Sequence, residues 1–98
     1  MSSKHLRNIT IAQFQAFLEL VHCQYISTNG GHEKWTRADL RRPIIFQTHI
    51  DPIPEFIVQN NLRVLGYNKS CYFDILEGKK EVVREENVFI LKEITTEE

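Results

Sequence analysis

Two adjacent glycines, Gly30 and Gly31, constrain the fold more than any other feature of the sequence. They follow Asn29 and separate two short runs rich in β-forming residues, 24–28 and 32–37. Glycine and asparagine accept the positive φ angles of a tight reversal, so the chain is predicted to turn back here. The two runs are therefore predicted to pair as an antiparallel hairpin.

A third strand is predicted over residues 43–48, after the polar loop 38–42. Pro43 stands at its first position, where a sheet does not need the backbone donor that proline lacks. The three runs together predict a three-stranded antiparallel meander.

Two helices are predicted to flank the meander. The sequence Thr-Ile-Ala-Gln at residues 10–13 is a capping-box pattern, which predicts a helix over about 11–22. Its apolar stripe consists of Ile11, Phe14, Phe17, Leu18 and Val21. A second helix is predicted from Pro54 to the left-handed cap at Gly66. Its predicted buried residues are Phe56, Ile57, Leu62 and Leu65.

The last third of the chain gives a weaker pattern. Residues 70–77 predict a short third helix that is capped by Ser70 and ended by Gly78. Its apolar set is Tyr72, Phe73 and Leu76. Residues 80–94 favour strands by composition, but their Glu and Lys spacing also suits a helix, so both interpretations stay open.

The expected fold class is α+β, with the order α-β-β-β-α and the helices on one face of the sheet. The chain has 98 residues with 42% apolar content, which suits one core and is too short for a second. Residues 1–98 are therefore interpreted as a single domain.

Strict alternation along the second strand separates its side chains onto two faces. His32 and Lys34 share one face, and Glu33, Trp35 and Arg37 share the other. If Trp35 packs under the helices, His32 and Lys34 project together into solvent. They also follow two glycines, beside which a ligand backbone can approach closely.

A histidine beside a fixed positive charge suits RNA cleavage by internal transesterification. The imidazole can take the 2′-hydroxyl proton or supply one to the leaving 5′-oxygen. Lys34 can stabilise the charge that develops on phosphorus. The alternative for His32 is an exposed histidine without a chemical role.

The sequence Gly30-Gly31-His32 resembles the Gly-x-His motif of the HicA toxin family, which opens the second strand in that family. The resemblance continues to His49 after the third strand and to residues 61–65 (Asn-Leu-Arg-Val-Leu), and it covers about residues 9–66. Residues 67–98 form a C-terminal extension to that core. Gly31 replaces the family's usual serine, Asn60 stands where glycine is frequent, and the usual proline before His49 is missing.

The resemblance implies a double-stranded-RNA-binding-like fold and a toxin of a toxin–antitoxin system. The implied activity is that of an mRNA interferase, an endoribonuclease that needs neither metal nor cofactor. His32 would be its catalytic residue, and a HicB-type antitoxin protein would neutralise it.

Other residues are expected to bind the RNA. Gly30, Gly31 and Lys34 surround His32, and His49 is carried by the motif; its alternative is a ring that bonds a backbone group. Arginine suits phosphates through its planar fork of donors, and the densest positive cluster is Arg37, Arg41 and Arg42. Their alternative is an ordinary solvated loop.

Charge, cysteines and hydropathy set further limits. The net charge is −1, but residues 1–50 carry six Lys/Arg against three Asp/Glu, whereas residues 51–98 carry six against ten. Cys23 and Cys71 are isolated and expected to be free thiols. The sequence shows neither a signal peptide nor a spanning segment, so a cytoplasmic protein without membrane contact is expected.

The sequence lacks the motifs of other common enzyme classes, including phosphate-binding glycine loops, a serine elbow and the HExxH zinc helix. His22, Cys23, His32 and His49 do not have the spacing of zinc ligands. Two other functions stay open beside the ribonuclease. One is a non-catalytic RNA-binding module, and the other is an interaction protein whose site has decayed.

Overall fold

The predicted hairpin and third strand form the centre of the fold. In the computed structural model, which describes residues 5–94, strands β1 (Gln24–Asn29), β2 (His32–Thr36) and β3 (Ile44–Gln47) form one antiparallel sheet in that order. The turn glycines have φ angles of +59° and +80°. The α+β class and the three-stranded meander are therefore confirmed, with each strand end within one residue of its prediction.

Helix α1 (Ile11–Leu20) begins at the predicted capping box. The Gln13 amide donates to the Thr10 hydroxyl over 3.1 Å, and the Gln13 side chain accepts from the Thr10 amide over 2.9 Å. The helix ends two residues before the predicted Val21–His22 end. It stops there because His22 has a φ of +70°, which no α-helical residue can adopt.

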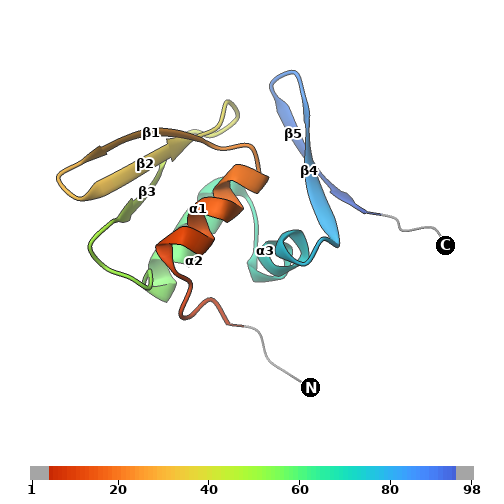
Figure 1. Cartoon of the computed structure of the whole chain (residues 1–98). Helices are drawn as coiled ribbons and strands as arrows, with labels where there is room; N and C mark the ends of the chain where they lie inside the picture. The colour runs from red at the N-terminus through yellow and green to blue at the C-terminus, as the bar shows by residue number, and fades with distance from the viewer. Residues whose placement is uncertain (1–4, 95–98) are drawn as a thin grey trace.

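Helix α2 (Glu55–Leu65) follows Pro54 and ends at Gly66, whose φ is +85°. Figure 1 shows α1 and α2 on the same side of the three-stranded sheet. The Asn61 carboxamide accepts from the Ile45 amide over 3.3 Å and donates to the Ile45 carbonyl over 3.0 Å. Because β3 is an edge strand, these bonds satisfy backbone groups that no neighbouring strand can pair.

The predicted buried face of α2 is wrong at Phe56, which is 63% exposed. The face that packs inward consists of Val58, Asn61, Leu62 and Leu65. Successive helical residues are about 100° apart, so Phe56 points almost opposite to Val58 two positions later. Ile57 lies between the two and is half-buried.

Helix α3 (Lys69–Leu76) begins earlier than predicted. Its cap is Asn68, whose side chain accepts from the Cys71 amide over 2.8 Å, and not Ser70. Its buried residues are Tyr72 and Ile75, whereas Leu76 is 41% exposed, so the predicted apolar set is wrong at Leu76.

The open question over residues 80–94 is decided in favour of strands. Strands β4 (Lys80–Glu85) and β5 (Val88–Glu93) form a hairpin that is a separate two-stranded sheet. It adjoins α3, and the His22 Nε2 atom lies 2.7 Å from the Val82 carbonyl oxygen.

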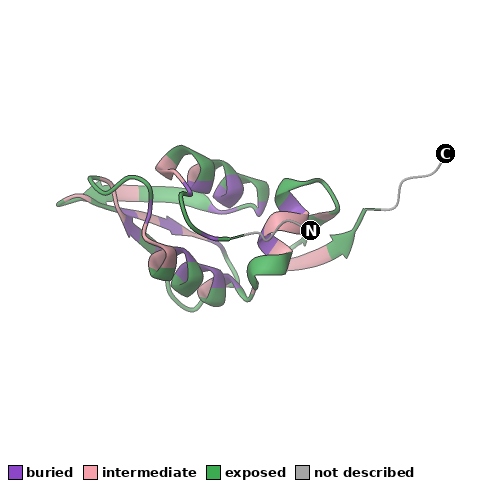
Figure 2. Ribbon diagram, turned by 90° about the horizontal axis from the view of Figure 1, so that it is seen from below, coloured by how far each residue is buried: buried purple, intermediate pink, exposed green. Residues whose placement is uncertain are grey.

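The core lies where the helices meet the sheet, as the buried residues in Figure 2 show. Phe14 of α1 meets Phe46 of β3 edge-on, with ring centroids 5.5 Å apart. Phe17 meets Tyr72 of α3 at 4.6 Å. The extension beyond residue 66 thus contributes to the same core as the residues before it.

Candidate functional site

The outer face of the meander carries His32 and Lys34, as the alternation predicts. Glu33 and Trp35 point inward and are each 5% exposed, whereas the His32 side chain is exposed and Lys34 is half-buried. The buried Glu33 carboxylate accepts from the Gln15 amide at 2.9 and 3.2 Å and from the Trp35 indole at 2.6 Å. This inner network fixes the face of β2 and so keeps His32 directed outward.

The glycine turn brings a second histidine to the same end of the sheet. The Thr48 amide donates to the Gly31 carbonyl over 2.8 Å, and the Thr48 hydroxyl donates to the same oxygen over 3.2 Å. The imidazole of His49 then lies against Gly31, with its Nδ1 atom 2.9 Å from the place that a Cβ would occupy. A side chain at position 31 would therefore compete with the His49 ring for the same space.

Neither imidazole is used to hold the fold together. Within residues 5–94, the rings of His32 and His49 have no hydrogen-bond or ion-pair partner. The alternative interpretation of His49, a ring that bonds a backbone group, is therefore wrong in this structure. Two free imidazoles are placed around one exposed turn.

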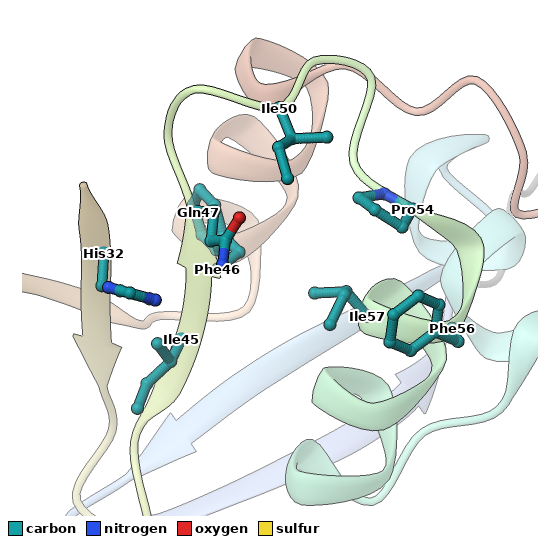
Figure 3. Close-up of a pocket in the computed structure, with 8 residues that line it drawn as sticks. All are labelled: His32, Ile45, Phe46, Gln47, Ile50, Pro54, Phe56 and Ile57. Carbon is teal, nitrogen blue, oxygen red and sulfur yellow. The ribbon is translucent and has the colours of Figure 1, made fainter.

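A pocket of about 340 Å³ lies next to His32 (Figure 3). His32 on β2 and the residues of α2 stand on its two sides, and residues of β3 lie between them. The lining is mostly apolar and comprises His32, Ile45, Phe46, Gln47, Ile50, Pro54, Phe56 and Ile57.

Arg37 has a structural position that rules out the predicted RNA contact. The residue is 4% exposed, and its guanidinium donates to Asp39 at 2.7 and 3.0 Å. It also donates to the Val21 carbonyl at 2.9 Å and the Tyr67 hydroxyl at 3.0 Å, and it stacks on the Phe89 ring at 4.6 Å. Arg37 thus joins the meander to β5 and is not available to phosphates.

The surroundings of Arg37 act on its pKa in opposite directions. Burial by itself lowers the pKa of the guanidinium, but the hydrogen bonds that it donates to Asp39 and Tyr67, together with the charge interactions with those groups, outweigh that effect and raise the pKa. Burial raises the pKa of the Tyr67 hydroxyl, against the opposing influence of the nearby Arg37 charge. The pair is therefore a cation that donates to a neutral phenol.

Arg41 and Arg42 are exposed, as an RNA contact requires. They line a shallow depression of about 590 Å³ together with Arg63 at the end of α2. This depression lies beyond the end of β2 opposite His32, and β2 by itself spans about 13 Å at about 3.3 Å per residue. The structure therefore separates the arginines from the two histidines.

The cysteines, the possible metal ligands and the membrane expectation remain to be compared with the structure. Cys23 and Cys71 are free thiols, and burial raises the pKa of Cys23 to about 11. Over residues 5–94, no three His, Cys, Asp or Glu side chains are grouped so as to hold a metal ion. No helix in that part of the chain has the length and apolar character needed to cross a membrane.

Comparison of the chain with protein-family models, with curated proteins and with solved structures finds no match.

Sequence reasoning missed the pocket because its lining comes from elements that are distant in the chain. Gln47, Ile50 and Phe56 were not among the candidate site residues, yet they line the pocket together with His32. One signal was available, since Phe56 lies off the apolar stripe that continues through Val58 and Leu62.

Proposed function

We propose that this chain is an endoribonuclease that acts on mRNA in the cytoplasm, with His32 transferring a proton in the reaction. The observation that carries the proposal is the state of His32. Its imidazole is exposed, has no internal partner within residues 5–94, and shares the outer sheet face with Lys34. An imidazole placed in this way can reach a bound strand, and imidazole is a usual proton-transfer group in catalysis.

The chemistry is transesterification within the RNA. The 2′-hydroxyl oxygen attacks the adjacent phosphorus and the bond from phosphorus to the 5′-oxygen breaks, which leaves a 2′,3′-cyclic phosphate and a 5′-hydroxyl. One proton leaves the 2′-oxygen and another reaches the 5′-oxygen, and His32 carries one of these transfers. The Lys34 ammonium stabilises the charge that grows on phosphorus. No step requires a metal or a cofactor.

Binding of the strand is assigned to the residues around His32 and to the exposed arginines. Gly30, which has open space where a Cβ would lie, allows the RNA backbone to approach the turn, and Gly31 makes room for the His49 ring, which contacts the strand there. Arg41 and Arg42 bind phosphates at the far end of β2. Arg37 is left out because it is buried.

We also propose the double-stranded-RNA-binding-like fold and the protein partner that the family resemblance implies. The order α1-β1-β2-β3-α2 is the one expected of a double-stranded-RNA-binding-like fold. A HicB-type antitoxin would neutralise the toxin by covering His32 with a surface that is acidic opposite Lys34. Protection of His32 from a histidine-modifying reagent in the complex would test that arrangement.

The test of the proposed function is cleavage of labelled single-stranded RNA in the presence of a chelator. The wild type is expected to cut and to leave cyclic phosphate ends, whereas His32→Ala binds without cutting. His5→Ala removes another exposed histidine, outside the site, and is expected to cut like the wild type. Induced expression should arrest growth and degrade mRNA only for the two active proteins.

The other outcomes assign the alternative functions. Salt-dependent RNA binding without cleavage by the wild type identifies an RNA-binding module. Absence of both binding and cleavage identifies an interaction protein with a decayed site.

A further inference from the structure

The pocket beside His32 has features that proton transfer does not use. Ile45 is 38% exposed, Ile50 is 40% exposed and Phe56 is 63% exposed, and all three line the pocket. Phe56 contributes little to the core because it lies opposite the buried stripe of α2. Together with Ile45 and Ile50 it forms an exposed apolar group beside His32, and such groups are frequent at binding sites.

The pocket also has two polar side chains, His32 on β2 and Gln47 on β3. Gln47 is half-buried at the end of β3, and among residues 5–94 its carboxamide has no hydrogen-bond partner. His32 pairs with Gln47 in the sheet register, so the two side chains lie next to each other on the outer face. Figure 3 shows the His32 ring directed toward the space beside Gln47.

An apolar cavity with one or two polar groups is the usual form of a small-ligand site. A volume of about 340 Å³ is at the lower end of the range of roughly 300 to 1,000 Å³ for such sites. The carboxamide supplies one donor and one acceptor side by side, which is the pair that complements the edge of a nucleobase. The Phe56 ring supplies a flat apolar surface on which a base can stack.

We propose that this pocket binds one unpaired nucleobase of the RNA, next to the nucleotide on which His32 acts. This inference rests on the proposed action on RNA and deepens it. The base stacks on Phe56, its edge bonds with Gln47, and its backbone runs past His32 and Lys34.

The geometry restricts the substrate to single-stranded RNA. A base within a duplex is stacked on both faces and paired along its edge, so it cannot enter a pocket without leaving the helix. The pocket opens beside His32, so the base that it holds also sets the position of the cut.

The experiment is a double-mutant cycle between the protein and the RNA. A short 2′-O-methyl oligonucleotide cannot be cleaved, because its 2′-oxygens carry no proton, so its dissociation constant reports binding alone. The same oligonucleotide is made with an abasic site at each position in turn. The full chain is titrated as wild type, Phe56→Ala and Phe56→Leu, with Val88→Ala as a control that removes an exposed apolar side chain on β5.

One abasic position is expected to weaken wild-type binding by roughly 5- to 150-fold, the value of one base stacked on an aromatic ring. Phe56→Ala weakens binding of the intact oligonucleotide to a similar extent and shows no further loss at that abasic position. Phe56→Leu is expected to behave like Phe56→Ala. Leucine keeps apolar contact, but it offers no aromatic ring on which a base can stack. Val88→Ala binds like the wild type.

Each outcome separates the pocket from the proposed catalysis. If Phe56→Ala and the wild type lose the same affinity at every abasic position, the pocket does not hold a base and the inference is overturned. If the two losses are coupled but ordinary RNA is not cut, the nucleobase site stands and the nuclease fails. If RNA is cut without such coupling, the nuclease stands and the nucleobase site fails.

Discussion

Gly31→Ala, with Gly30→Ala as its matched control, distinguishes the cost of a positive φ angle from the cost of displacing the His49 ring. Both glycines have a positive φ, +59° at Gly30 and +80° at Gly31. A Cβ at Gly30 meets nothing within 4 Å, whereas a Cβ at Gly31 would lie 2.9 Å from Nδ1 and 3.0 Å from Cε1 of His49. Both substitutions therefore place an L-residue at a positive φ, but only Gly31→Ala also displaces the His49 ring.

The shared cost is that of an L-residue in the left-handed region, about 1–2 kcal/mol. For a chain of this size each kcal/mol lowers the melting temperature by about 4–8 °C. The additional cost at Gly31 is displacement of the His49 ring, since two hydrogen bonds from Thr48 hold the Gly31 carbonyl in place. A ring forced away from its rotamer costs of order 0.5–1.5 kcal/mol.

The assay is urea unfolding followed by the fluorescence of Trp35, the chain's one tryptophan, with NMR of the imidazoles. Gly31→Ala should lose more free energy of unfolding than Gly30→Ala and should shift the His49 ring resonances. In a His49→Ala background the two glycine variants should become equally stable. An excess cost that persists without the His49 ring would refute the reasoning.

Three further predictions concern groups outside the turn. Arg37→Leu should lower the free energy of unfolding by about 2–4 kcal/mol, because it breaks a largely buried ionic network. The exposed control Arg41→Leu should change it by less than about 0.5 kcal/mol. Equal urea midpoints for the two variants would contradict this prediction. Asn61→Leu leaves two backbone groups of β3 without partners and should cost about 2–3 kcal/mol in the same assay, against little change for its exposed neighbour in Asn60→Leu. Burial raises the pKa of Cys23 from 9.0 to about 11, so the folded state holds this proton more tightly and stability should fall by up to about 2–3 kcal/mol between pH 9 and pH 11. In thermal unfolding measured between pH 9 and pH 11, Cys23→Ala should lose less stability than the wild type. If the stabilities of the two proteins fall in parallel with pH, the Cys23 thiol does not contribute.

The turns and helix ends were predictable from short stretches of sequence. The Gly30-Gly31 reversal, the capping box at residues 10–13 and the left-handed cap at Gly66 each depend on residues within a few positions of one another. The outward direction of His32 was also predictable, since alternation along β2 needs only a buried Trp35 as its reference.

Other features depended on partners that the local pattern does not reveal. Arg37 was predicted to bind RNA, but it shares the inward face of β2 with Trp35 and meets Asp39, Tyr67 and Phe89. Two of these three partners lie in the extension beyond residue 66, so the charge pattern of the loop alone could not show that the arginine is buried.

Local patterns in the sequence by themselves determined the α+β class, the meander and the face that carries His32. The tertiary structure decided which charges are free, that His49 packs on Gly31, and that Phe56 joins His32 around one pocket. The physical reason is the range of the interactions. Backbone conformation and strand alternation act between neighbours in the chain, whereas burial, ion pairing and pocket formation depend on residues that meet only after the chain has folded.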